Sequence, residues 1–469
     1  MLTIFSGGGE RRCDGATRRD FLRVGALGIG GLTLLHLLQA RAAATQAQSS
    51  YVHDKAIVLL FLSGGASHIE TFDPKMTMPE EMRSITGTVP TSIPGERFGG
   101  TFPQLARLAN HMSVVRSFTH PIGGHEQAIV HVLTGGTDRD GRGEQGFSMG
   151  SLVSRIGGTN HPVTGLPRYV LINENEVDRQ YIREKSRVEK GSRPGFLGST
   201  FGPFNPNGGG GAAMQNMTLN VPQERMDDRV SLLRAFDDLN RDIESNRAGE
   251  LADPFQQQAL NLITGGGAVR AMDLSEEDPR LLARYDTNHI EIGHRNMRPS
   301  TLGRQMLMAR RLVEAGCGFI TVHSAGWDMH ADSNNPGIEV GMNRLGRSVD
   351  KAVSAFIEDL RQRGLYDRVL LVITGDFGRT PRINNRGGRD HWARLCTLAF
   401  AGGGLNMGQI VGRSGSRADV PNSPPIDASN LMGTILHTMF NVQEIRLRPD
   451  VPRDLSVLVE RAEPIEELF

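Results

Sequence analysis

The stretch Ala56-Ile-Val-Leu-Leu-Phe-Leu62 is an unbroken apolar run, and Ser63-Gly64-Gly65 follows it directly. An apolar run of this length, bounded by polar residues and glycines, predicts a central, buried strand. Further along, segments with helical spacing (301–315, 337–363) alternate with short apolar runs (318–322, 368–374), and a last apolar run covers 395–400. Helices that alternate with strands predict right-handed crossovers and a parallel sheet. The sequence therefore predicts an α/β fold around the Ala56–Leu62 strand.

The rest of the chain fits a single domain over residues 52–460. We predict further helices at 102–110, 125–133, 222–246 and 430–440, and further strands at 112–116 and 168–172. The stretch 174–220 shows little apolar periodicity and contains four consecutive glycines at 208–211. It is expected to form an irregular surface insertion near the site.

The first 44 residues have the pattern of an export signal. Thr17-Arg18-Arg19-Asp20-Phe21-Leu22-Arg23 is a twin-arginine pattern, a short apolar stretch covers 24–38, and Ala42-Ala43-Ala44 is typical of a cleavage site. The apolar stretch is too short for a comfortable membrane span. We expect the twin-arginine export machinery as a partner, a periplasmic or extracellular location, and no stable membrane span after cleavage. The alternative is an amphipathic N-terminal helix.

Composition narrows the classes of partner. The chain has 52 Lys and Arg residues against 52 Asp and Glu, so its formal net charge is zero. A balanced charge does not indicate nucleic acid or an anionic membrane as the main partner. Cys317 and Cys396 each adjoin a predicted core strand. Buried free thiols are expected there, with one disulfide as the alternative.

Histidines and aspartates gather in three segments, 323–330, 375–380 and 387–392, and the first two of these follow predicted strands. Ligands of open α/β sheets gather beyond the carboxyl ends of the strands. Asp328, His330, Asp376 and His391 are therefore the candidate metal ligands, because carboxylate oxygen and imidazole nitrogen suit a cation such as zinc or manganese. Any one of these histidines could instead be a hydrogen-bonded structural residue.

The loop after the first strand offers candidate catalytic groups. Ser67 or Thr71 is a candidate nucleophile, and His68 is its candidate base. His125 lies at the start of a predicted helix, where it could act as a base or contact an oxyanion. The alternative there is a helix cap and turn.

An arginine is the candidate anion-binding group. Arg379 is followed by the hydroxyl of Thr380, and an arginine fork beside a hydroxyl can hold a phosphate or sulfate. The alternative is an arginine that pairs with Asp376 or Asp390 and only holds the loop.

Five segments together resemble a known family. They are Phe61-Leu-Ser-Gly-Gly-Ala-Ser-His-Ile-Glu-Thr-Phe-Asp-Pro-Lys75, the His125 segment up to Leu133-Thr-Gly-Gly136, Trp327-Asp-Met-His330, Gly375-Asp-Phe-Gly-Arg-Thr-Pro381 and Gly388-Arg-Asp-His-Trp392. They resemble an exported bacterial family catalogued as domain of unknown function 1501, which is similar to the alkaline phosphatase and sulfatase superfamily. The resemblance covers roughly residues 52–460. It implies a three-layer sandwich in which helices flank a central, mostly parallel sheet.

The resemblance also implies metal-dependent hydrolysis of phosphate or sulfate esters. Asp328, His330 and His391 match the ligands of one superfamily metal. Asp376 matches half of an Asp-His pair that binds a second metal, but Phe377 stands in place of the histidine. Ser63-Gly64 likewise stands where that site requires an aspartate, so a complete two-metal phosphatase is not expected.

Formylglycine chemistry is excluded by the sequence. A sulfatase of that type needs Cys or Ser followed by x-Pro-x-Arg. Cys317 is followed by Gly-Phe-Ile and Cys396 by Thr-Leu-Ala, and no serine of the first-strand loop has the pattern.

These expectations combine into an exported hydrolase with one divalent cation, namely zinc, manganese or calcium. It would act on a phosphate or sulfate ester, with a polysaccharide-linked ester as one option. Asp376 is either the fourth ligand or a residue that orients a ligand, and the nucleophile is Ser67, Thr71 or a metal-bound water. The alternatives are a non-catalytic protein that binds carbohydrate or protein at the cell envelope, and a purely structural envelope protein.

Overall fold

A seven-stranded sheet forms the centre of the fold, in the order β13-β4-β12-β9-β1-β8-β5. The computed structural model describes residues 51–162, 164–173, 178–206 and 267–469. The predicted export signal and the predicted helix 222–246 lie outside these residues. The strands of the sheet are β1 (Ala56–Leu62), β4 (Ser113–Val115), β5 (Tyr169–Ile172), β8 (Phe319–Ser324), β9 (Val369–Gly375), β12 (Leu398–Gly402) and β13 (Gln409–Val411).

The middle of the sheet is parallel. β1 pairs with β8 and β9, so that Leu62 lies beside both Ser324 and Gly375 at the carboxyl ends of the strands. All seven residues of β1 are buried, as expected of a strand covered on both faces. β12 runs antiparallel to both β9 and β4. No crossover helix lies between β9 and β12, so the chain turns back from the edge at which β9 ends and pairs with β9 in the opposite direction. The mostly parallel central sheet is confirmed.

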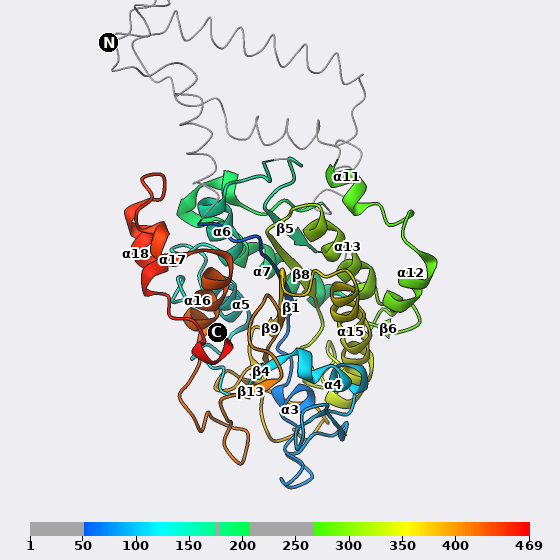
Figure 1. Ribbon diagram of the computed structural model, residues 1–469. Helices are drawn as coiled ribbons and strands as arrows, with labels where there is room; N and C mark the ends of the chain where they lie inside the picture. Colours follow the sequence, from blue (N-terminus) through cyan, green and yellow to red (C-terminus); the bar gives the residue numbers. More distant parts are fainter. Residues whose placement is uncertain (1–50, 163, 174–177, 207–266) are drawn as a thin grey trace, which may run out of the picture. The chain divides into compact units, whose positions relative to one another are not determined.

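Helices lie on both sides of the sheet and complete three layers (Figure 1). One group consists of α4 (Pro103–Arg107), α11 (Gly267–Met272), α12 (Pro279–Tyr285), α13 (Leu302–Glu314) and α15 (Arg347–Gln362). The other includes α5 (His125–Leu133), α6 (Met149–Gly157), α7 (Arg179–Gly191) and α16 (Ala428–Met439). The remaining helices are α3 (His68–Thr71), α14 (Ile338–Gly341), α17 (Val442–Ile445), α18 (Arg453–Arg461), the π-helix η4 (Met342–Gly346), and the 3-10 helices η1 (Ala109–His111), η2 (Gly195–Leu197), η3 (Ser199–Phe201) and η5 (Glu466–Leu468).

Three small antiparallel pairs lie outside the main sheet. They are β2 (Thr88–Pro90) with β3 (Arg97–Gly99), β6 (Glu291–Ile292) with β7 (Arg298–Pro299), and β10 (Gly378–Arg379) with β11 (His391–Trp392). The last pair matters for the site, since it places Arg379 directly opposite His391.

A side chain from a distant segment caps one helix, and a local capping box starts another. The carboxylate of Asp350, on α15, accepts the backbone N–H groups of Gln104 and Leu105 and so caps α4. α16 starts with a capping box between Asp427 and Asn430. These contacts satisfy N–H groups that have no partner within their own helix.

Most predicted elements are present, and α5 has the predicted bounds. The prediction of an irregular insertion is wrong for Arg179–Gly191, because these thirteen residues form the helix α7. The buried positions of α7 are Tyr181, Glu184, Val188 and Gly191, which lie on one helical face. Apolar periodicity does not reveal this face, because a glutamate and a glycine occupy two of its four positions.

Two further predictions concern cysteines and membrane spans. Cys317 and Cys396 are free and buried, as expected. Among the helices within residues 51–162, 164–173, 178–206 and 267–469, none combines the length and apolar character needed to cross a membrane.

Candidate metal centre

The candidate site lies beyond the carboxyl ends of β1, β8 and β9. The loop after β8 carries Asp328 and His330, and Asp376 follows β9 directly. β11 carries His391, and α5 begins with His125. The parallel register of the three strands brings these segments to one edge of the sheet.

Four side chains converge there. One ligand atom from each of His125, Asp328, His330 and His391 can be chosen so that all four lie within 4.8 Å of one another. Nε2 of His330 lies 2.8 Å from Oδ1 of Asp328, and Nε2 of His391 lies 3.4 Å from the same oxygen. Nε2 of His125 lies 3.3 Å from the second oxygen, Oδ2. Asp328, His330 and His391 are predicted metal ligands. The fourth member of the cluster is His125, and not the predicted Asp376.

Each histidine is held by an oxygen at its other ring nitrogen. Nδ1 of His125 contacts Oδ2 of Asp376 at 2.5 Å, and Nδ1 of His330 contacts Oδ1 of Asp390 at 3.1 Å. Nδ1 of His391 lies 3.0 Å from the carbonyl oxygen of Gly123. An oxygen acceptor keeps the proton on Nδ1, so a neutral ring directs its Nε2 lone pair into the cluster.

The short distance between two histidine nitrogens indicates that the cluster fits a cation. Nε2 of His330 lies 2.8 Å from Nε2 of His391. Nη1 of Arg379, which can only donate, lies 3.4 Å from the same nitrogen of His330. Two lone pairs at this separation repel each other unless a proton or a cation lies between them. Three imidazole nitrogens and one carboxylate oxygen form a donor set that fits a divalent cation, zinc in particular.

Charges within the cluster shift its pKa values. Burial alone would raise the pKa of Asp328, but contacts with the three histidines and with Arg379 outweigh it and hold that pKa well below its usual range. Burial opposes protonation of His125, yet Asp328 and Asp376 raise its pKa to about 9. The pKa of His391 is lowered, first by burial and then by Arg379. A carboxylate that stays ionised is a competent metal ligand over the whole physiological range.

Arg379 is not free to clamp an anion. Its side chain is completely buried. Nε donates to the carbonyl of Gly65 at 2.9 Å, Nη1 to that of Arg389 at 3.0 Å, and Nη2 to Oδ1 of Asp328 at 2.6 Å. The loop-holding alternative therefore describes Arg379 better, with Asp328 as its acidic partner.

The structure does not bring Ser67, His68 and Thr71 into the cluster. Ser67 caps α3, and the hydroxyl of Thr71 donates to the carbonyl of Ser67 at 2.8 Å. Nε2 of His68 contacts the carbonyl of Ala418 at 2.9 Å, and burial lowers the pKa of His68 to about 4. The predicted nucleophiles Ser67 and Thr71 thus form hydrogen bonds within α3, and the predicted base His68 holds the backbone of Ala418.

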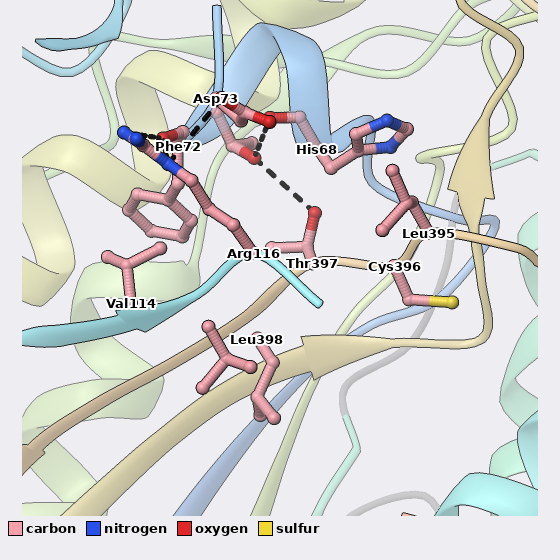
Figure 2. A pocket seen from close by; sticks show the side chains of 11 residues that line it. His68, Phe72, Asp73, Val114, Arg116, Leu395, Cys396, Thr397 and Leu398 are labelled. Atoms are coloured by element: carbon pink, nitrogen blue, oxygen red, sulfur yellow. Dashed lines mark hydrogen bonds and ion pairs between the residues drawn. The ribbon is translucent and has the colours of Figure 1, made fainter. Parts of the chain in front are cut away.

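A small cavity lies beside these residues, and Figure 2 shows His68, Asp73 and Thr397 on its wall. Its volume of about 10 Å³ leaves room for roughly one water molecule and none for an ester substrate.

Two further histidines, His120 and His323, are buried and make structural hydrogen bonds. His323 is 1% exposed and bonds Ser63 Oγ at 2.6 Å and Asn173 Oδ1 at 2.7 Å. His120 is buried and contacts the backbone carbonyl of Asp376 at 2.6 Å. Both support the segments that carry the cluster without joining it.

Phe377 closes one side of the centre. Its ring centroid lies 4.8 Å from that of His125 and 4.5 Å from that of His391. The ring also touches the backbone at Gly65, where an added Cβ would lie 2.7 Å from it. An apolar ring thus packs at the position where the superfamily pattern requires a second-metal histidine.

The predictions include Asp390 only as a partner of Arg379 and assign no role to Glu184 and Arg389. Asp390 orients His330, and its position directly before His391 was the available signal. Glu184 accepts Ser63 Oγ at 2.7 Å and Gly326 N–H at 2.8 Å, and burial raises its pKa to about 8. Arg389 is fully buried, which the sequence does not indicate.

The family model described as "Protein of unknown function (DUF1501)" matches residues 54–469. The chain belongs to this family. The resemblance inferred from the five segments is thereby confirmed. None of the curated proteins matches the sequence of this DUF1501 protein.

Solved structures similar to this DUF1501 protein include hydrolases of the expected superfamily. The PsFucS1 sulfatase from Pseudoalteromonas sp. is 12% identical, with a TM-score of 0.38 over 90% of this chain and 75% of that one. The phosphonate monoester hydrolase SpPMH from Silicibacter pomeroyi is 11% identical, with a TM-score of 0.36 over 82% and 73%. A mutant of TAB5 alkaline phosphatase with Mg bound in its M3 site is 8% identical, with a TM-score of 0.35 over 83% and 98%.

Proposed function

We propose that this DUF1501 protein binds one divalent cation through His125, Asp328, His330 and His391 and hydrolyses a phosphate or sulfate ester there. The observation that carries the proposal is the orientation of the three histidines. Each has its Nδ1 held by an oxygen, and the Nε2 atoms of His330 and His391 face each other at 2.8 Å. Ligand histidines in metal sites are held in this way.

The donor set narrows the choice of metal. Three imidazoles and one carboxylate suit zinc or manganese, whereas calcium takes oxygen ligands almost exclusively. Zinc or manganese is therefore preferred over calcium, which the sequence left open. When bound, such an ion supplies a Lewis acid and lowers the pKa of a coordinated water.

The protein's own residues prepare the site in distinct ways. Asp376 keeps the proton on Nδ1 of His125, and Arg379 fixes the carboxylate of Asp328. Phe377 covers His125 and His391 with an apolar ring. The side chain of Asp390 is 54% exposed, so an ester would approach from that side.

The nucleophile assignment follows from burial. Ser67 and Thr71 are each 1% exposed and their hydroxyls serve the turn of α3, which leaves water as the favoured attacking group. We also propose that the protein is exported, because residues 17–23 have a twin-arginine pattern. A polysaccharide-linked ester outside the cytoplasm is one substrate that an exported hydrolase would meet.

A second candidate function has one observation in its favour. Arg379 is committed to Asp328, so it is not available to bind the anionic part of an ester. That commitment favours the non-catalytic alternative, in which the centre binds metal and the protein recognises carbohydrate or protein at the envelope.

Activity after metal reconstitution separates the two candidates. The protein would be stripped with chelator, reloaded with zinc or manganese, and assayed against aryl phosphate, aryl phosphonate and aryl sulfate esters. Hydrolysis that depends on added metal and disappears in Asp328→Ala supports the hydrolase. His289→Ala, which changes an exposed histidine on another part of the surface, is the matched control. Metal binding without turnover of any ester would favour the binding protein.

A further inference from the structure

A fully buried ion pair between Glu70 and Arg389 lies next to the candidate metal centre. Both side chains are 0% exposed. Oε1 of Glu70 accepts from Nη2 of Arg389 at 2.8 Å and from Nε at 3.1 Å. Arg389 directly precedes Asp390 and His391, which orient and supply ligands of the centre.

The guanidinium of Arg389 joins two further segments to α3, which carries Glu70. It donates to the carbonyl of Arg83 at 2.8 Å and to that of Met82 at 3.3 Å. It also donates to the carbonyl of Thr380 at 3.1 Å and to that of Pro381. One side chain therefore connects the 82–83 turn, the 380–381 turn and α3.

The backbone of Arg389 contacts both the segment that carries Asp328 and the side chain of Arg379, which pairs with Asp328. Its N–H donates to the carbonyl of Met329 at 3.0 Å, and its carbonyl accepts from Nη1 of Arg379 at 3.0 Å. A Cβ at the neighbouring Gly388 would lie 2.2 Å from the carbonyl carbon of His330, so the loop fits tightly against that ligand. A shift of Arg389 would therefore move His391 relative to Asp328 and His330.

Glu70 is itself held by several donors. Oε2 accepts from Ser84 Oγ at 2.8 Å and from Thr86 Oγ1 at 3.2 Å, and Oε1 accepts from the N–H of Ile85 at 3.2 Å. The carboxylate is thus fixed before it meets Arg389. A planar guanidinium paired with a fixed carboxylate has a defined orientation as well as a defined position.

We propose that Glu70 and Arg389 are a positioning pair that sets the places of Asp390 and His391 and thereby the metal affinity of the centre. This inference rests on the proposed function. A buried ion pair adds little net stability compared with apolar residues of the same volume, so stability alone does not account for it. The geometric role predicts that metal binding, and not only folding, depends on the pair.

Metal affinity measured beside folding stability tests the pair. Arg389→Lys keeps the charge but loses the fork, and Glu70→Gln keeps the shape but loses the charge. Zinc affinity would be measured by competition with a chromophoric chelator, and the visible spectrum of the cobalt-loaded protein would report the geometry of the centre. We expect zinc affinity to fall about 10- to 100-fold in each variant, with an altered cobalt spectrum, and less than additive loss in the double variant.

Arg310→Lys is the matched control. Arg310 also forms a buried ion pair, with Nη2 2.7 Å from Oε1 of Glu277, but on α13. It should lower the unfolding free energy while zinc affinity and the cobalt spectrum stay unchanged. Ser84→Ala, which removes one donor to Glu70, is the milder variant if the charge-altering ones do not fold, and a several-fold weaker zinc affinity is expected.

The outcomes separate this inference from the proposed function. If the parent binds zinc and the Glu70 and Arg389 variants bind it equally well, the positioning role is wrong and the metal centre stands. If the parent binds none of zinc, cobalt and manganese, both the centre and the positioning role are wrong.

Discussion

Nδ1 of His125 lies 2.5 Å from Oδ2 of Asp376, and this contact joins the start of α5 to the end of β9. The carboxylate accepts a hydrogen bond from the Nδ1–H group of the ring, so Nε2 of His125 faces Asp328. Asp376 is completely buried, and its other carboxylate oxygen has no hydrogen-bond partner among the described residues. A buried carboxylate with one strong contact of this kind is suited to orienting a ligand.

Removal of this carboxylate should weaken metal binding. In Asp376→Ala, the ring of His125 loses the acceptor that fixes its orientation and tautomer, and zinc affinity should fall about 10- to 100-fold. A chelator competition assay measures the loss. Asp350→Ala, which removes a buried carboxylate that caps α4, should leave the affinity unchanged. Equal zinc affinity in Asp376→Ala and the parent would show that Asp376 does not orient a ligand of the site.

Arg379→Met should destabilise the metal-free protein more than the metal-loaded protein. Without metal, the variant leaves Asp328 without its buried cation, and breaking such a pair costs about 3–5 kcal/mol. A bound zinc ion offsets part of this loss, because it also neutralises Asp328. Urea unfolding with and without saturating zinc measures both values. An identical loss under the two conditions would show that Asp328 and the cation do not interact.

Gly64 should tolerate no side chain. Its φ is +103°, and a Cβ there would lie 2.4 Å from the backbone nitrogen of Asp328. Gly95 is the control for backbone strain alone, because its φ is +84° and an added Cβ there would have nothing within 4 Å. Gly95→Ala should cost about 1–2 kcal/mol and leave metal content intact. Gly64→Ala should cost more and lower the metal content, and equal effects of the two changes would exclude the collision.

Glu184 should make stability depend on pH. Burial raises its pKa from 4.5 to about 8, so between these values the folded state keeps a proton that the unfolded state releases. The unfolding free energy therefore falls as pH rises through this window. Glu184→Gln offers an amide oxygen to Ser63 and Gly326 and has no such proton. The stability of the variant relative to the parent should rise by a few kcal/mol between pH 5 and pH 9. A constant difference across that range would show that Glu184 is ionised in the folded protein.

The sheet could be predicted because its strands are self-contained apolar runs. The run at Ala56–Leu62 is buried at every position, and no other element is needed to recognise it. α7 was missed because its buried face includes Glu184 and Gly191. The direction of β12 was missed because apolar pattern indicates a strand but not the path by which the chain reaches it.

The candidate site was predictable where ligands follow strands. Asp328 and His330 lie a few residues beyond β8, so the sheet itself indicates their location. The choice between the two predicted roles of Asp376, ligand or orienting residue, and the place of His125 in the cluster could not be predicted. About 250 residues separate the two side chains, and their order around the centre is set by how α5 packs. The burial of Arg379 also follows only from the approach of Gly64 and Gly65.

Elemental analysis of the protein, purified without chelator, tests the metal centre most directly. The parent would be measured beside Asp328→Ala, His391→Ala and the control His289→Ala. The account predicts about one equivalent of zinc or manganese in the parent and in the control, and loss of the metal in the other two variants. A parent that holds no metal even after reconstitution, or that keeps its metal in Asp328→Ala and His391→Ala, would contradict it.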